Sequence, residues 1–395
     1  MSEGPARSVR VHALATTVPS YAYDQAYARD RMLDWIPDAR VQRLIRRLYD
    51  RSGIARRYSV LPDFMQGADA RLFAAGPAGI PESPSTGARN AVYVEASKPL
   101  GVEVARKALV ERTEFDPSDV THLVTVSCTG FFNPGPDVEI MHQLGLPDSV
   151  ERYHLGFMGC YAAFPALKMA EQFCRVDPDA VVLIVCIELC TLHLQINGAA
   201  DSVLANALFA DGAAAAIVSA REPLASRPGL VLHGFQSALA PEGHDAMAWA
   251  IGDRGFNLML SSYVPDIIAA NLRGITDRAL AERGLGVEDI DVWAIHPGGR
   301  AILDRIETGL AMDAVKIADS RAILNDFGNM SSATVLFVLE RILEARIAVP
   351  QSICAMAFGP GLTIETALMT TCPARCPGGG VAGAATTVYE GGLVI

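Results

Sequence analysis

The chain has 395 residues and 50% of them are hydrophobic, so it can bury one large core or two closely packed cores. Its 44 acidic residues outnumber its 33 lysines and arginines, and the net charge of −11 argues against nucleic acid or an anionic membrane surface as a general partner. No apolar run is long enough to cross a bilayer, and the first residues lack the apolar core of a signal peptide, so no membrane insertion is expected. The eight cysteines show no disulfide or zinc-site spacing, and we therefore expect reduced thiols, no metal and a cytoplasmic location.

The first 100 residues contain helical segments and a cluster of basic side chains. Seven arginines lie between residues 40 and 57, among them Arg43, Arg47 and Arg51. A run of this kind is usually a solvated helix face. In an acidic chain it is also a candidate for a local basic patch that receives an anionic substrate.

Two parts of the chain resemble each other. Residues 107–126 are typical of the end of a helix, a short acidic loop and a buried strand, and residues 278–295 repeat that order. Each copy then reaches a glycine-marked turn into an apolar helix, at Gly159 in the first copy and at Gly328 in the second. A repeat of this length indicates a duplicated domain rather than a solenoid.

The predicted strands are apolar runs without alternation, at residues 181–186, 213–218 and 353–358. Strands buried on both faces indicate a layered α/β architecture, with helices on either side of each sheet. We place the N-terminal half at residues 1–230 and the C-terminal half at residues 231–370. The remaining residues, 371–395, are rich in Gly, Ala, Thr and Pro and are expected to form a flexible tail.

Cys160 is the strongest candidate for a reactive group. It follows Gly159 in a glycine-rich turn that leads into an apolar, helix-forming stretch. A helix N-terminus and a neighbouring histidine lower the pKa of a thiol from its usual value of about 8.5, so we expect Cys160 to be held as a thiolate. The alternative is an inert buried thiol, which is what most cysteines are.

Two later segments supply partners for such a sulfur. His296 ends a buried strand and is followed by Pro297 and two glycines, which stop the strand and allow a ligand to approach closely. Asn329 precedes an apolar helix, where it can cap the helix or aim its amide N–H at a developing oxyanion. The same placement puts Ser332 near the position in the second copy that corresponds to Cys160. Cysteine, histidine and asparagine together indicate covalent acyl chemistry.

Five motifs make the chain resemble the type III polyketide synthases, the chalcone-synthase-like branch of the thiolase superfamily. They are residues 159–160, 207–212, 296–299, 328–333 and 358–363. The resemblance covers roughly residues 10–370 and implies a duplicated, thiolase-like α-β-α-β-α fold.

The resemblance implies a role for each candidate residue. Cys160 would be the nucleophile that carries the growing acyl chain, and His296 with Asn329 would form the oxyanion hole that promotes decarboxylation of malonyl-CoA. Phe209 is similar to the gatekeeper aromatic residue at the cavity mouth. Arg47 and Arg51 match basic positions that bind coenzyme A phosphates, with Arg43 beside a third position that is Leu44 here. The substrates would be an acyl-CoA starter and malonyl-CoA, no metal or redox cofactor would be needed, and the protein would be a homodimer.

The cavity implied by the resemblance departs from the plant pattern. Leu258 replaces a phenylalanine, Trp249 replaces a glycine, Cys190 and His193 stand at positions that are usually threonine, and Asn133 replaces the methionine that reaches into the partner subunit. Further cavity residues are expected at Cys128, Ser331, Phe358, Gly359 and Pro360. These changes favour an aliphatic starter and an alkylpyrone or alkylresorcinol-type product, although Trp249 can refill the space that Leu258 opens.

Three other functions remain open from the sequence. A ketoacyl-carrier-protein synthase III or related acyltransferase would share the cysteine, histidine and asparagine, but should lack the motifs at residues 296–299 and 359–361. A catalytically silent acyl-binding scaffold would leave Cys160 unreactive. A cysteine hydrolase is disfavoured because the local motifs of papain-type proteases are absent.

Overall fold

The computed structural model describes residues 7–65, 67–74, 76, 80–222, 227–345 and 349–372. The predicted tail, 371–395, lies outside the described residues from position 373 onward. None of the helices in these ranges is both long and apolar enough to span a bilayer.

Five strands from the first part of the chain form one portion of a mixed sheet. In spatial order they are β5 (Glu151–Gly156), β4 (His122–Ser127), β6 (Val181–Leu189), β7 (Asp211–Ser219) and β1 (Arg10–Thr17). The pair β4–β6 is parallel, whereas β6–β7 and β7–β1 are antiparallel. Every residue of β6 and β7 is buried, as the unbroken apolar runs predicted.

The second portion repeats this pattern of directions. Its strands are β11 (Val292–Ile295), β12 (Ser352–Gly359), β13 (Thr363–Cys372) and β8 (Gly229–Leu239). Here too the first pair is parallel and the next two pairs are antiparallel. The duplication predicted from the sequence is therefore confirmed in the strand order. The predicted boundary between residues 230 and 231 falls just inside β8 and stays a prediction.

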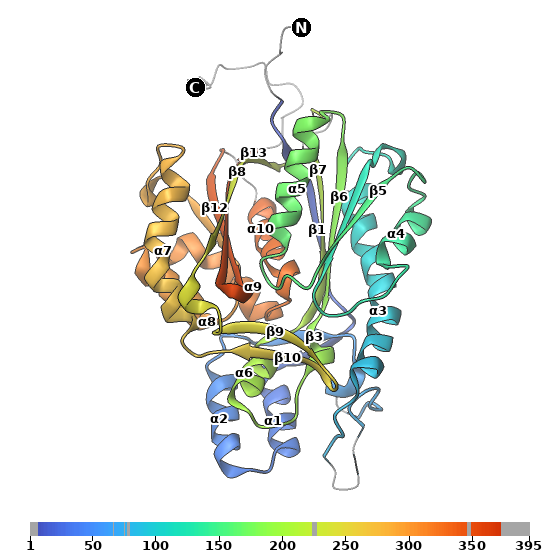
Figure 1. The fold of residues 1–395 in the computed structure, drawn as a ribbon, viewed down its shortest axis with the longest axis vertical. Helices are drawn as coiled ribbons and strands as arrows, with labels where there is room; N and C mark the ends of the chain where they lie inside the picture. Colours follow the sequence, from blue (N-terminus) through green and yellow to red (C-terminus); the bar gives the residue numbers. More distant parts are fainter. Residues whose placement is uncertain are drawn as a thin grey trace.

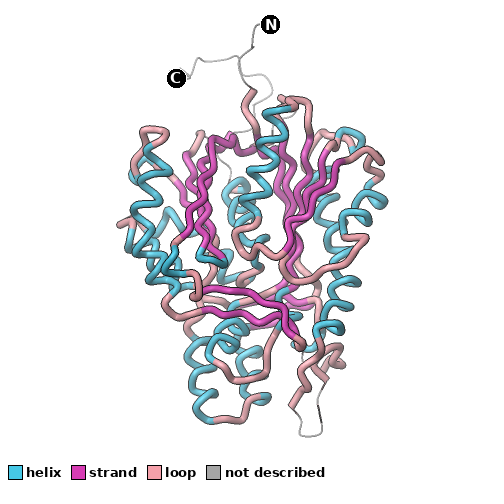
Figure 2. Tube along the Cα trace, in the orientation of Figure 1, coloured by secondary structure: helices cyan, strands magenta, loops and turns pink. Residues whose placement is uncertain are grey.

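The two portions are joined by a narrow seam. Strands β1 and β8 share two residue pairs, Arg10 with Val231 and Val11 with Leu230, so hydrogen bonding links all nine strands into one sheet. Figures 1 and 2 show the strands splaying into two groups on either side of this seam, with α5 (Ala163–Val176) and α10 (Thr334–Glu344) between them. The predicted order of layers, α-β-α-β-α, is confirmed.

The outer and middle layers bury different cores. The outer helices are α3 (Thr86–Arg106) and α4 (Pro136–Leu144) on one side, and α7 (Val264–Ala281), α8 (Arg300–Gly309) and α9 (Ala318–Phe327) on the other. The middle core combines both sheet portions with α5 and α10. Because the first turns of α10 have apolar neighbours on all sides, they are buried all round, and residues 334–339 include no charged side chain.

Short elements close one end of the layers, at the bottom of Figure 1. They are α1 (Gln25–Trp35), α2 (Ala39–Asp50), α6 (Ala200–Leu208), the hairpin of β2 (Tyr21–Asp24) with β3 (Arg56–Ser59), and the hairpin of β9 (Met247–Gly252) with β10 (Gly255–Leu260). Strands β6 and β12 end, and β7 begins, near this end, so that loops from both portions of the sheet meet there.

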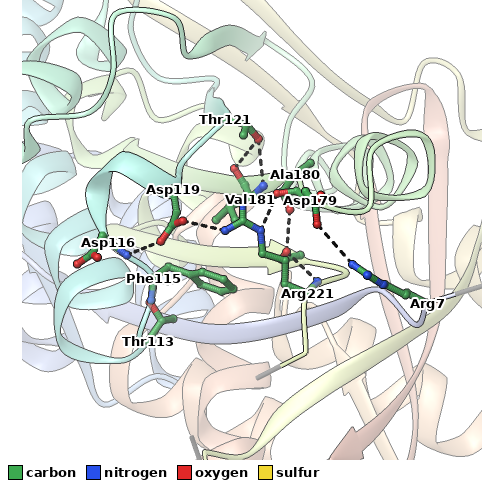
Figure 3. Close-up of polar contacts among 11 residues, drawn as sticks. Arg7, Thr113, Phe115, Asp116, Asp119, Thr121, Asp179, Ala180, Val181 and Arg221 are labelled. Atoms are coloured by element: carbon green, nitrogen blue, oxygen red, sulfur yellow. Dashed lines mark hydrogen bonds and ion pairs between the residues drawn. The ribbon is translucent and has the colours of Figure 1, made fainter. Parts of the chain in front are cut away.

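The opposite end is held by polar contacts, centred on Arg221 just after β7 (Figure 3). Arg221 donates through Nη1 to Asp119 and through Nε to the main-chain oxygen of Asp179, both at 2.8 Å. These bonds tie the end of β7 to the loops that precede β4 and β6. The two ends thus differ in character, because one is pinned by ion pairs and the other encloses a cavity.

Candidate active site

A cavity of about 360 Å³ lies where the end elements meet the two portions of the sheet. Its volume is in the range of small-molecule sites. Cys160, His296 and Asn329 all contribute to its wall, although they are far apart in the sequence. Cys160 comes from the N-terminal half, and the other two come from the C-terminal half.

Cys160 lies in the turn between β5 and α5, and Gly159 makes that turn possible. Gly159 has a φ of +88°, and a Cβ there would come within 2.6 Å of Cδ of Pro360. No other residue type fits both conditions. The turn leaves the Cys160 side chain partly exposed to the cavity, with its Sγ 4.0 Å from Oδ1 of Asn329.

His296 directly follows β11 and is 1% exposed. Neither ring nitrogen has a hydrogen-bond partner among the described residues. Burial lowers the pKa of His296 to about 3, so the imidazole is neutral. A buried polar side chain of this kind is rarely left without a partner. His296 also contributes to the wall of the cavity.

Asn329 is fixed by both its main chain and its side chain. It forms a parallel bridge with Phe209, in which its N–H donates to Leu208 and its carbonyl accepts from Ala210, each at 2.9 Å. Its Oδ1 accepts the main-chain N–H of Ser331 at 2.8 Å, which orients the amide. Its Nδ2 then donates one hydrogen to the carbonyl of Gly298 at 3.3 Å and keeps a second for a ligand.

The alternative explanation, that Asn329 serves only to cap the following helix, does not match the structure. A 3₁₀ turn, Ser331–Ala333, intervenes, and α10 begins only at Thr334. Ser332, the predicted counterpart of Cys160, is buried and donates to the carboxylate of Glu188. It therefore has no access of its own to the cavity and is not a second nucleophile.

The expected lowering of the thiol pKa was also wrong for the resting site. Burial raises the pKa of Cys160 to about 11, a nearby carboxylate at Glu188 acts in the same direction, and hydrogen bonds with Ser331 and Asn329 oppose the increase. A neighbouring histidine lowers the pKa of a thiol when it is cationic, but the buried His296 is neutral. The Cys160 thiol and the His296 imidazole are therefore both uncharged in the resting site.

Sequence reasoning missed Glu188 at the end of β6. It is fully buried and accepts hydrogen bonds from the N–H of Cys128 at 3.0 Å and the hydroxyl of Thr129 at 2.9 Å, and burial raises its pKa. The carboxyl group anchors the segment that carries Cys128 beside the cavity. A glutamate that ends an otherwise apolar strand was the available signal.

Two aromatic side chains close one wall of the cavity. His193 accepts the main-chain N–H of Phe256 at its Nδ1 and donates from Nε2 to the carbonyl of Thr129 at 2.7 Å, so it is neutral with a fixed tautomer. Trp249 donates from its indole to the carbonyl of Cys128 at 2.9 Å. Leu258 lies opposite Trp249 in the β9–β10 hairpin. The indole therefore occupies space next to the smaller leucine.

Most of the predicted cavity residues lie on the cavity wall: Cys128, Cys190, His193, Phe209, Trp249, Leu258, Ser331, Phe358 and Pro360. Gly359 does not, because it packs against the ring of Tyr161. Asn133 does not either, because it lies exposed in the loop before α4. Within one chain, the cavity assignment of Gly359 is corrected, whereas a place for Asn133 at the cavity of a partner subunit stays a prediction.

Exposed arginines line part of the cavity. They lie in the last turn of α2, directly after it, and at the start of α8. Arg47 and Arg51 contribute to the cavity wall, whereas Arg43, which lies one turn before Arg47 on α2, is exposed and lies outside it. Arg300 also contributes and was missed by the sequence reasoning. Its position directly after the glycines that follow His296 was the available signal.

The layered fold and a cavity that carries cysteine, histidine and asparagine define a thiolase-like enzyme of acyl transfer. Residues 1–223 match the N-terminal domain of chalcone and stilbene synthases, and residues 231–373 match the C-terminal domain of that family. The chain belongs to this family, whose members are type III polyketide synthases, and it is a transferase.

Individual proteins agree with this assignment. The chain is 34% identical over 363 residues to the alpha-pyrone synthesis polyketide synthase-like Pks18 of Mycobacterium tuberculosis, and the match covers 90% of this chain and 89% of Pks18. The crystal structure of PKS-I from the brown alga Ectocarpus siliculosus matches with a TM-score of 0.87 and 31% identity, over 94% of this chain and 100% of that one. The C-terminal type III polyketide synthase domain of Steely1 from Dictyostelium matches with a TM-score of 0.84 and 26% identity, over 92% of this chain and 99% of that one.

Proposed function

We propose that this type III polyketide synthase carries its growing chain on Cys160 and extends it with malonyl-CoA, using His296 and Asn329 as the polar groups of the reaction. The observation that carries the proposal is the imidazole of His296, which lines the cavity with both ring nitrogens free of partners among the described residues. A functional ligand explains such a group better than folding does.

The first step loads the starter. Sγ of Cys160 passes its proton to the neutral His296, and the sulfur attacks the carbonyl carbon of the acyl-CoA. Coenzyme A leaves as a thiolate and takes the proton back from His296. The transfer of one proton between neighbouring groups creates an ion pair rather than a lone buried charge, which is why a raised thiol pKa and a lowered imidazole pKa are compatible with reactivity.

The second step extends the chain. Malonyl-CoA loses carbon dioxide, and the electron pair of the broken C–C bond becomes an enolate. The enolate oxygen accepts hydrogen bonds from the ring N–H of His296 and from the free N–H of Asn329. The enolate carbon then attacks the thioester on Cys160, and the sulfur leaves as a thiolate. Loss of one such donor typically lowers turnover by about 10²–10³.

The cavity mouth supports binding of coenzyme A esters. Arg47, Arg51 and Arg300 give a basic rim to an acidic protein, and the guanidinium group pairs well with phosphate. We propose that these residues bind the phosphates of the substrate. Phe209, half-buried on the cavity wall, is the proposed gatekeeper between this rim and Cys160.

The lining supports an aliphatic starter. Apolar side chains dominate the wall away from the three polar groups, among them Met32, Leu48, Phe64, Leu194 and Leu260. Such a surface favours alkyl chains through burial of apolar area. We propose an alkylpyrone or alkylresorcinol-type product, and the similarity to Pks18, an alpha-pyrone synthesis polyketide synthase-like protein, supports the pyrone. We also propose a homodimer that needs no cofactor other than its CoA-ester substrates, with Asn133 at the partner's cavity.

Product analysis tests the proposed function. Purified protein is incubated with labelled malonyl-CoA and a panel of acyl-CoA starters of increasing length, and the products are identified by mass spectrometry. We expect cyclised alkyl products with malonyl-CoA alone as extender. Exclusive use of malonyl-carrier protein would instead indicate a ketoacyl synthase III-like enzyme, and failure of iodoacetamide to label Cys160 would indicate a silent scaffold. Light scattering checks the dimer.

A further inference from the structure

Arg57, in β3, is a buried arginine that the proposed mechanism does not use. It is 3% exposed, and its Nε has no hydrogen-bond partner among the described residues. Its neighbour Arg56 lies on the surface within 3.9 Å of the carboxylate of Asp24, whereas none of the ion pairs between described residues includes Arg57. Burial of an unpaired guanidinium is unfavourable unless other groups replace water around it.

The hydrogen-bond acceptors of Arg57 lie at the C-terminal end of α6. Its Nη1 donates to the carbonyl of Asn206 at 2.8 Å and to the carbonyl of Phe209 at 2.7 Å. The rings of Tyr23 and Tyr49 face its guanidinium carbon at 5.2 and 5.7 Å. Carbonyls at a helix C-terminus carry partial negative charge, so this end of α6 compensates the cation in place of a carboxylate.

These carbonyls belong to the segment that holds Asn329. The main chain of Asn329 is bonded to Leu208 on one side and to Ala210 on the other, each at 2.9 Å, and Phe209 stands between those two residues. By binding the carbonyl of Phe209, Arg57 fixes the middle of the bridge. Any rotation of that peptide would move both the Phe209 ring and the Asn329 amide.

Arg57 touches the other side of the bridge as well. Gly328 precedes Asn329 with a φ of +75°, and a Cβ at Gly328 would lie 3.0 Å from both Cγ and Cδ of Arg57. The stem of Arg57 therefore packs closely against the chain on one side of the bridge, while its guanidinium binds the chain on the other.

We propose that Arg57 is a positioning residue, which sets the Asn329 amide and the Phe209 ring relative to Cys160. The inference rests on the proposed function, because it gives Asn329 a role in stabilising the enolate. Arg57 itself acts through the main chain of residues 206–210 and does not take part in the chemistry.

Two rates, those of malonyl-CoA decarboxylation and of Cys160 alkylation, distinguish a positioning role of Arg57 from a role in the stability of the whole fold. Decarboxylation of malonyl-CoA needs the donors of His296 and Asn329, whereas alkylation of Cys160 by iodoacetamide needs only the sulfur and its base. In Arg57→Lys the charge remains, but the shorter side chain should not carry its nitrogen as far as the two carbonyls that Nη1 of Arg57 binds. We expect the ratio of the decarboxylation rate to the alkylation rate to fall at least about tenfold, as part of the loss seen when an oxyanion donor is removed.

Arg89→Lys is the matched control. Arg89 is also fully buried, and it also donates to main-chain carbonyls, at Leu194 and Pro84, but it does not contact residues 206–210. We expect its ratio to stay within about threefold of the wild-type value, because the oxyanion donors are undisturbed. An equal fall in both variants, or an unchanged ratio in Arg57→Lys, would overturn the proposal.

If Arg57→Lys does not fold, as judged by circular dichroism, Arg57→Gln is measured in the same way. Glutamine removes the charge but keeps an amide NH2 group that can donate to a main-chain carbonyl. If neither variant folds while Arg89→Lys does, Arg57 serves the whole fold and the positioning role is refuted. Absence of decarboxylation in the wild-type protein would refute the proposed function instead, so the two failures are distinguishable.

Discussion

The sulfur of Cys160 and the amide oxygen of Asn329 face each other across 4.0 Å, and they belong to opposite halves of a duplicated fold. Asn329 turns this oxygen toward Cys160 because the main-chain N–H of Ser331 holds it there. Each half of the fold therefore supplies only part of the proposed site. Cys160 comes from one half, and His296 and Asn329 come from the other.

Substitution of the sulfur separates the two chemical steps. In Cys160→Ala we expect polyketide formation to be abolished, because no thioester can form. We expect decarboxylation of malonyl-CoA to continue at a measurable rate, since His296 and Asn329 remain. Labelled carbon dioxide and product are measured in parallel. Retained polyketide synthesis would refute the assignment of the nucleophile.

The histidine should control how the thiol reacts with pH. In His296→Asn the thiol loses its proton acceptor, and burial keeps the pKa of Cys160 at about 11. We expect alkylation of Cys160 by iodoacetamide to be at least about tenfold slower than in the wild type at pH 7, and to rise about tenfold per pH unit up to pH 9. The wild-type rate should be much less steep. Equal profiles would show that His296 does not accept the proton.

The basic rim should act on binding rather than on chemistry. Arg47→Glu places a negative charge where a phosphate is proposed to bind, so we expect KM for the CoA ester to rise about tenfold or more while kcat changes less. Arg43→Glu is the matched control, because Arg43 lies on the same helix outside the cavity. Similar KM values for the two variants would remove Arg47 from substrate binding.

His193 should make the fold sensitive to acid. Burial lowers its pKa from 6.5 to about 4 in the folded protein. Between these values the unfolded chain binds a proton that the folded chain does not, so stability that is complete above pH 6.5 is lost as pH falls to 4, by about 3 kcal/mol. In His193→Gln this part of the loss should disappear. Urea unfolding of both proteins at several pH values measures it, and parallel curves would contradict the assignment.

The residues of the proposed site could be picked out from the sequence because each sits in a short motif with its own physical reason. Gly159 before Cys160, and the glycines after His296, mark places where the chain turns sharply or a ligand approaches closely. The duplication could be predicted for a similar reason, because a buried strand leaves an apolar run that survives in both copies.

Other features depend on partners that are remote in the sequence. The roles of Glu188 and Arg57 depend on contacts with residues 128–129 and 206–209, respectively. The residues next to Glu188 and Arg57 in the sequence do not indicate those contacts. The pKa of Cys160 depends on how deeply the folded cavity is closed, which a helix-terminus argument cannot supply. How far along α2 the cavity extends is likewise decided by packing, and it separates Arg47 from Arg43, which lies one turn earlier on the same face.

The position of β1 has a consequence for how the chain is made. This strand comes from residues 10–17, yet it is inserted between β7 and β8, which end at residues 219 and 239. During synthesis both edges of β1 therefore stay unpaired until more than half of the protein has left the ribosome. Contacts over such separations form slowly, and exposed strand edges promote association between chains. Chaperones that shield nascent apolar strands should accordingly increase the yield of this enzyme.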